Sequence, residues 1–154
     1  MEQAIFLFAW KRFSIKGIYE ARKSKLSKVV LQAIFTGMML SSPIILELQK
    51  KSLVDNYVES NLIGTVYISL IVLNVIFLLG LSVMALAINM TAADPFSLKE
   101  IFAFLSYTAT IPAVVSMVAG MFGNVSFVYF VYNFGILFFA YFVYKKGQLR
   151  ACME

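Results

Sequence analysis

The sequence predicts an all-α protein, a polytopic bundle of four transmembrane helices with both ends of the chain in the cytoplasm. Of its 154 residues, 61% are hydrophobic and 14% are charged, whereas soluble domains average about 45–50% and about 25%. A single core in a chain of this length could not bury so much apolar surface. Four long stretches also lack Lys, Arg, Asp and Glu altogether, and such stretches are stable in a lipid bilayer.

Residues 1–28 are expected to form a basic cytoplasmic segment that begins with a short helix lying in the membrane interface. Phe6, Trp10 and Phe13 recur at helical spacing and would share one face, and cations follow them closely. Such a helix places its rings at the depth of the lipid headgroups. A disordered cationic tail is the alternative, since so short a helix is marginal without packing.

The first span is predicted over residues 29–46. Ala33, Gly37 and Ser41 recur every four residues in it, and small residues at this spacing let two helices approach closely. Pro43 lies near the far end of the span, where a kink or the end of the helix costs little. Residues 47–61 are then the only substantial hydrophilic connection, and we expect it to face the outside.

The second span is predicted over residues 62–90. At 1.5 Å per residue this run would be about 44 Å long, which exceeds the roughly 30 Å of a hydrocarbon core. The helix must therefore tilt or project beyond the bilayer. Asp94-Pro95 breaks the chain in a short cytoplasmic turn, and Ser97 to Glu100 have the spacing of a capping box for the next helix.

The third and fourth spans are predicted over residues 101–122 and 127–144, followed by a cytoplasmic tail, residues 145–154. Pro112 near the middle of the third span should bend it or free a backbone carbonyl. The third span carries small residues four apart, and the fourth holds ten aromatic residues in eighteen positions. Gly123-Asn124 between them signals a tight turn. We expect a hairpin in which rings of one helix fill a groove of small residues on the other.

The distribution of cations predicts the orientation. Eleven of the 13 Lys and Arg residues lie before the first span, between the second and third spans, or after the fourth. Only Lys50 and Lys51 lie in the connection on the opposite side. The positive-inside rule places the eleven in the cytoplasm. These cations serve as topology signals and contacts for anionic lipid headgroups, so nucleic-acid binding is not expected.

The residue types exclude most site chemistry. None of the four spans has an ionisable Lys, Arg, Asp or Glu in its interior, which disfavours a proton-coupled carrier or a voltage sensor. The chain has no histidine, the commonest general base and metal ligand, and a single cysteine, Cys152. We therefore expect no catalytic residue, no cofactor and no metal, and hence no enzyme.

The remaining candidates are small or uncharged polar residues within the spans. Asn74 and Asn133 are expected to form hydrogen bonds between helices, the alternative being that they line a polar pathway. Thr108 and Thr110 can satisfy carbonyls freed by the nearby proline, the alternative being a hinge or a binding groove. The candidate helix-packing or polar-path residues are Ala33, Gly37, Ser41, Asn74, Tyr107, Thr108, Thr110, Pro112, Ser116, Gly120 and Asn133.

Two stretches resemble a known family. The run from Phe13 to Arg22, which leads into a first span ending Ser41-Ser42-Pro43, resembles a Gram-positive membrane-protein family labelled for maltodextrin utilisation. The run from Phe96 through Pro112 is similar to the penultimate helix of that family and to the tyrosine-and-proline helix of the wider Yip1-like superfamily. Family members usually carry an extracytoplasmic domain after the first span, which residues 47–61 are too short to form. The resemblance implies a minimal, multi-pass protein of a bacterial cytoplasmic membrane, linked to sugar uptake.

These observations lead to one expected function and one alternative. The expected function is that of a non-enzymatic accessory protein whose helices pack against a membrane-protein partner or a second copy, in assembly, trafficking or regulation of, for example, a sugar transporter. The alternative is a small transporter or channel subunit with a polar path through the second to fourth spans.

Overall fold

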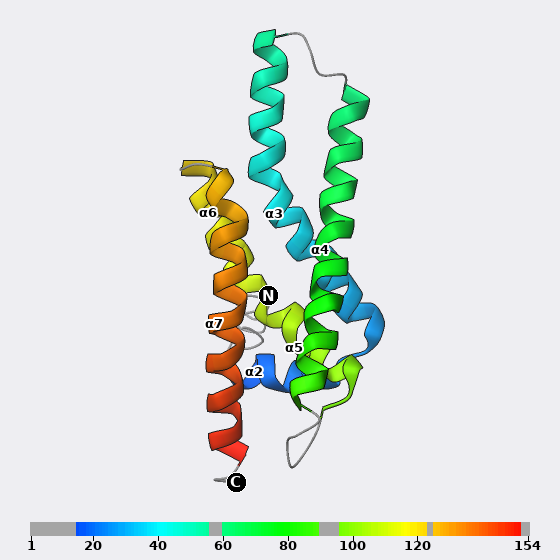
Figure 1. The fold of residues 1–154 in the computed structure, drawn as a ribbon, viewed down its shortest axis with the longest axis vertical. Helices are drawn as coiled ribbons and strands as arrows, with labels where there is room; N and C mark the ends of the chain where they lie inside the picture. Colours follow the sequence, from blue (N-terminus) through cyan, green and yellow to red (C-terminus); the bar gives the residue numbers. More distant parts are fainter. Residues whose placement is uncertain (1–14, 56–59, 90–95, 123–124, 152–154) are drawn as a thin grey trace, which may run out of the picture.

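The computed structural model describes residues 15–55, 60–89, 96–122 and 125–151, and all the regular structure within them is helical (Figure 1). Four helical runs are long and apolar enough to cross a membrane, as the sequence predicts. The Phe6–Trp10–Phe13 segment and the Asp94-Pro95 and Gly123-Asn124 turns lie outside the described residues. The elements are α2 (Ile15–Glu20), the 3-10 helix η1 (Ala21–Lys23), α3 (Leu26–Asp55), α4 (Ser60–Asn89), α5 (Leu98–Thr108), α6 (Thr110–Phe122) and α7 (Ser126–Ala151).

The first long helix extends well past its expected span, residues 29–46, whereas the second agrees closely with the expected residues 62–90. α3 and α4 have 30 residues each, about 45 Å at 1.5 Å per residue, and their connected ends project beyond the α6–α7 hairpin (Figure 1). The hydrophilic connection expected over residues 47–61 is therefore helical over 47–55 and 60–61, the parts of it that the structure describes. Helix α3 continues through Pro43 to Asp55, and α4 begins at Ser60. Polar residues such as Glu, Gln and Lys favour a helix nearly as well as Leu does, so loss of hydropathy did not mark the end of the helix.

The third span lies at the centre of the fold. Every residue from Ile101 to Thr110 is buried, and α5 packs against α2, η1, α3, α4 and α7. We compare the buried share of the most apolar 18-residue window in each span. This share is 72% in the third span, 39% in α3, 22% in α7 and 17% in α4. The third span, which includes Ser106, Thr108 and Thr110, is thus the one most enclosed by other helices.

The central span is interrupted at Ala109, which separates α5 from α6. The cause is Pro112, which has no N–H to donate to the carbonyl of Thr108 and whose ring crowds that carbonyl. The Ala109 N–H still donates to Leu105 and its carbonyl accepts from Ala113, so the chain stays close to helical across the break. The bend that Pro112 predicts is thus a one-residue interruption, three residues before the proline.

The start of α5 confirms the predicted capping box. The Glu100 N–H donates to the Ser97 hydroxyl at 3.3 Å, and the Ser97 N–H donates to the Glu100 carboxylate at 2.9 Å. The Ser97 hydroxyl also donates to that carboxylate, at 2.8 Å. Two backbone N–H groups at the helix start are thereby satisfied, which fixes where the central span begins.

Close helix contacts occur where a glycine faces a neighbouring backbone or a proline ring. A Cβ built on Gly37 of α3 would lie 3.1 Å from the Ile71 Cα of α4. On Gly120 of α6 it would lie 3.0 Å from Pro43 of α3, and on Gly135 of α7 it would lie 2.9 Å from Pro112 of α6. Each of the two prolines inside a span thus packs on a glycine of the adjacent helix, which brings the helices together as small residues do in membranes.

The α6–α7 hairpin does not pack as expected, with the aromatic rings of α7 in a groove of small residues on α6. The side of α7 that faces inward carries Val128, Tyr132, Ile136 and Val143, all at most 1% exposed. Most of the aromatic rings point outward instead. The exposed rings of α7 are Phe127, Tyr129, Phe130, Phe134, Phe138, Tyr141 and Phe142. The expected complementarity was wrong because one face of a helix holds only a third or so of its residues, and the aromatic run is too long to lie on that face.

The basic N-terminal segment is packed against the bundle from α2 onward. Ile18 is 1% exposed, and α2 contacts α5 and α7. The guanidinium of Arg22 lies 4.5 Å from the Tyr19 ring centroid and 4.4 Å from that of Phe96, and Phe96 makes an edge contact with Tyr144 of α7 at 6.0 Å. These cation–π and ring contacts join the segment to the start of α5 and the end of α7.

The Gly37 contact generates a stability prediction. We expect Gly37→Leu to lower the free energy of unfolding by about 1–3 kcal/mol, because its side chain would push against the backbone of α4. The matched control is Gly64→Leu on α4, where a Cβ meets nothing within 4 Å. Thermal unfolding in mild detergent, followed by circular dichroism, measures both variants; equal midpoints would contradict the close packing of α3 on α4.

Candidate functional site

The side-chain amide of Asn74 on α4 joins three helices. Its Nδ2 donates to the main-chain oxygen of Ala33 at 2.9 Å and to the hydroxyl of Thr36 at 3.1 Å, both on α3. Its Oδ1 accepts from the hydroxyl of Tyr132 on α7 at 2.7 Å. Asn74 is 6% exposed. A buried amide without partners is costly, and here both donor hydrogens and the acceptor are engaged.

A second polar contact lies one helical turn away on α3, next to the interruption of the central span. The amide of Gln32 donates to the hydroxyl of Thr110 at 2.6 Å, and Thr110 donates to the Ser106 carbonyl at 3.5 Å. The hydroxyl of Thr108 donates to the Phe104 carbonyl at 2.7 Å. The two threonines therefore turn toward main-chain carbonyls of α5, and only Thr110 also reaches another helix.

The small-residue candidates lie at helix contacts. Ala33 and Ser41 of α3 are fully buried, and the Ser41 hydroxyl donates to the Gly37 carbonyl at 2.9 Å. Tyr107 and Ser116 are buried on the central span. The hydroxyls of Ser106 and Ser116 have no hydrogen-bond partner in the described part of the chain. Each lies four residues after a helical carbonyl that a rotation of the serine would reach, so neither requires a ligand.

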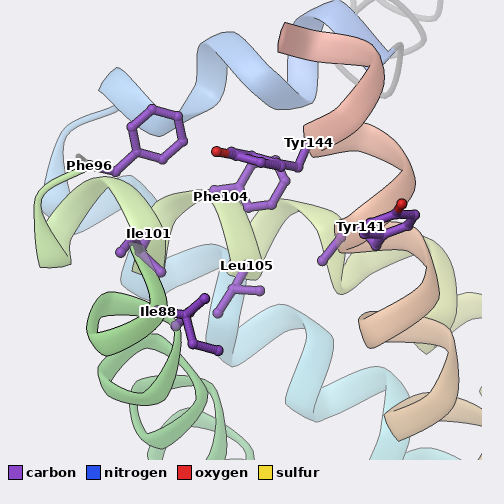
Figure 2. Close-up of a pocket in the computed structure, with 9 residues that line it drawn as sticks. Ile88, Phe96, Ile101, Phe104, Leu105, Tyr141 and Tyr144 are labelled. Atoms are coloured by element: carbon purple, nitrogen blue, oxygen red, sulfur yellow. The ribbon is translucent and has the colours of Figure 1, made fainter. Parts of the chain in front are cut away.

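Two cavities lie between α4 and α7, which approach each other mainly through side chains. The first, of about 350 Å³, is called the Asn133 cavity here; it is lined by Leu70, Leu73, Asn74, Phe77, Tyr129, Tyr132 and Asn133. The second, of about 370 Å³, is called the Phe96 cavity; it is lined by Ala85, Ile88, Phe96, Ile101, Phe104, Leu105, Ala140, Tyr141 and Tyr144 (Figure 2). Neither lining contains a charged residue.

Neither cavity holds the groups of an acid–base or metal site. In the described ranges no three Cys, Asp or Glu side chains come together as metal ligands. The Asn133 cavity offers amides and phenol hydroxyls, which donate and accept hydrogen bonds but do not transfer protons readily near neutral pH. What the arrangement provides chemically is hydrogen bonding between helices, one apolar cavity and one cavity with amides and hydroxyls, both of the size of small-molecule sites.

Several residues of this site were missed in the sequence. Gln32 and Thr36 are uncharged polar residues in an apolar span, and that contrast was the available signal. Tyr132 was counted among ten aromatic residues, and nothing in its spacing distinguished it. Gly135 is the only glycine of the fourth span, but its partner Pro112 lies 23 residues earlier, on the neighbouring helix.

No family model matches the chain, and neither a curated protein nor a solved structure matches it. The class that the fold defines is therefore an all-helical chain with four candidate membrane-spanning helices.

The Asn74 contacts generate a second prediction. We expect Tyr132→Phe to lower the free energy of unfolding by about 0.6–1.7 kcal/mol, since it removes one hydrogen bond between helices. In a double-mutant cycle with Asn74→Leu, the two losses should not add, because both changes break the same bond. The control is Tyr129→Phe on the exposed side of α7. Strict additivity in unfolding experiments would show that the bond contributes nothing.

Proposed function

We propose that this chain is a non-enzymatic integral membrane protein that acts by packing its helices against a membrane-protein partner or a second copy. The observation that carries the proposal is the contrast in burial between the spans. The central span is 72% buried, whereas α4 is 17% and α7 is 22% buried. Buried polar side chains such as Asn74 form hydrogen bonds between the spans. The broad apolar faces of α4 and α7 remain available to lipid or to another helix.

The outward face of α4 supports a contact with a partner helix. Gly80 is exposed there, and a Cβ at this position meets nothing within 4 Å. Leu73, Ile76 and Val83 on the same helix are more than half exposed. Glycine on a lipid-facing surface lets a second backbone approach closely, and van der Waals packing then favours association in the bilayer.

A second candidate function is a small transporter or channel subunit. The Asn133 cavity favours it, because this cavity brings two amides and two phenol hydroxyls to the space between α4 and α7. Against it, the Asn74 amide is already bonded to three groups, so it has little capacity to coordinate a solute. Flux in reconstituted vesicles that is abolished by Asn133→Leu would favour this function over the first.

The proposed location is a cytoplasmic membrane of bacterial type, with both ends of the chain inside. Arg22, Lys23 and Lys25 precede α3, and Lys28 lies in its first turn. Lys99 lies in the first turn of α5, and Lys145 follows the apolar part of α7. These positions lie toward the same ends of the spans, and the positive-inside rule places them in the cytoplasm. The likeness to the Gram-positive maltodextrin-utilisation family, as a minimal member without an external domain, is part of this proposal and suggests a transporter as the partner.

The orientation can be tested with the single cysteine. In intact cells, we expect Cys152 to resist a membrane-impermeant maleimide and to react only after the membrane is permeabilised, because the proposal places the tail in the cytoplasm. The control is the double variant Cys152→Ser with Asn56→Cys, whose single cysteine lies in the connection between α3 and α4. This cysteine should be labelled without permeabilisation. The opposite pattern would reverse the orientation.

The partner contact can be tested on α4. We expect Gly80→Leu to reduce recovery of the partner, or of a second tagged copy, at least about fivefold in mild detergent, because the added side chain keeps the other helix away. Ile76→Leu, one turn earlier, leaves the bulk unchanged and should retain association. Recovery of only a monodisperse monomer from the unaltered chain would contradict the proposal.

A further inference from the structure

The Phe96 cavity lies where the apolar spans meet the charged end of the molecule. Ile88 is next to the last residue of α4, Phe96 precedes the start of α5, and Tyr144 is followed by Lys145. Tyrosine and other rings at such a boundary lie at the level of the lipid headgroups. Figure 2 shows Phe96 and Tyr144 along the side of the cavity nearest the N-terminal segment, with Ile88 and Leu105 toward the opposite side.

The cavity is open toward the surface between α4 and α7. Ile88 is 76% exposed and Tyr141 is 65% exposed, although both line it, whereas Ile101, Phe104 and Leu105 at its base are at most 7% exposed. All nine lining residues are apolar or aromatic. Such a shape and surface fit a hydrocarbon chain that enters sideways from the bilayer.

Two cations each lie near a ring of the lining. The Arg22 guanidinium lies 4.4 Å from the ring centroid of Phe96, and the Lys145 ammonium lies 5.9 Å from that of Tyr141, and both rings line the cavity. The nearby carboxylate of Glu100 is hydrogen-bonded to Ser97 in the capping box. Two rings of the apolar lining are thus each accompanied by a cation, which attracts a headgroup phosphate.

We propose that the Phe96 cavity binds one anionic membrane phospholipid, with an acyl chain inside and the headgroup phosphate against Arg22 and Lys145. A chain that leaves the bilayer for an apolar cavity gains little hydrophobic energy, because the lipid it leaves is equally apolar. The preference for this lipid over others therefore comes from the headgroup charge. A basic residue near the surface favours an anionic lipid by about fivefold.

The test uses the purified full-length chain in phosphatidylcholine vesicles that contain a trace of a photoactivatable lipid. The probe carries a diazirine on its acyl chain and either a phosphatidylglycerol or a phosphatidylcholine headgroup, and mass spectrometry maps the labelled residues. We expect the phosphatidylglycerol probe to label the lining of the cavity about 25-fold more than the phosphatidylcholine probe, about fivefold for each of the two cations.

Two kinds of variant separate the site from general lipid contact. Lys145→Gln should reduce the labelling by phosphatidylglycerol about fivefold, and Arg22→Gln with Lys145→Gln should bring it to the phosphatidylcholine level. Lys25→Gln with Lys28→Gln removes the same charge from the same end, away from the cavity, and should retain most of the labelling. Ala140→Phe fills the cavity and should reduce labelling by both probes. Arg22→Lys keeps the positive charge and should preserve the labelling by phosphatidylglycerol.

Three results would overturn the proposal. Equal labelling by the two probes would show that Arg22 and Lys145 do not favour an anionic headgroup. Labelling spread evenly over α3, α4 and α7 would show ordinary boundary lipid. A lining that neither probe labels would show that lipid does not enter the cavity, as when a second copy covers it. Because only purified chain and lipid are present, none of these results depends on whether a partner protein exists.

Discussion

Three of the four long helices meet at one amide. Asn74 of α4 donates to Ala33 and Thr36 of α3 and accepts from Tyr132 of α7, so the rotation of each helix about its axis must bring these groups together. In hydrocarbon no water can replace a missing partner, and a misrotated helix would leave the amide unsatisfied. Apolar packing alone is tolerant of such rotations, since lipid and leucine are nearly equivalent neighbours. The hydrogen bonds therefore specify an arrangement that hydrophobicity cannot.

Proline and glycine take a complementary role. Pro43 and Pro112 each remove a hydrogen bond from their own helix, yet each ring packs on a glycine of the next helix, Gly120 and Gly135. The two pairs link α3 to α6 and α6 to α7 in sequence. At Pro112 the cost appears as the interruption at Ala109, beside which Thr110 meets Gln32. A local defect in one helix is thus the place where another helix forms a polar contact.

The sequence was sufficient for the number and rough position of the spans, because length and lack of charge are local properties. It also located the capping box at Ser97 and Glu100, whose partners are three residues apart. It failed where the outcome depends on residues far apart in the chain. The polar stretch from Glu47 to Asp55 carries no signal that distinguishes a loop from a projecting helix. Likewise, one of the three partners of Asn74 is the main-chain carbonyl of Ala33, a group that every residue possesses, so no residue type could reveal it.

The order in which the chain is synthesised determines when each hydrogen bond between helices can form. Gln32 enters the membrane with α3, but its partner Thr110 is made 78 residues later. The contacts of Asn74 with Ala33 and Thr36 become available as soon as α4 is complete, whereas Tyr132 follows 58 residues behind Asn74. A chain inserted as it emerges from the ribosome can therefore assemble α3 and α4 as a stable early pair. That pair would still carry unmet hydrogen-bonding groups, which recruit the later helices to one side of it.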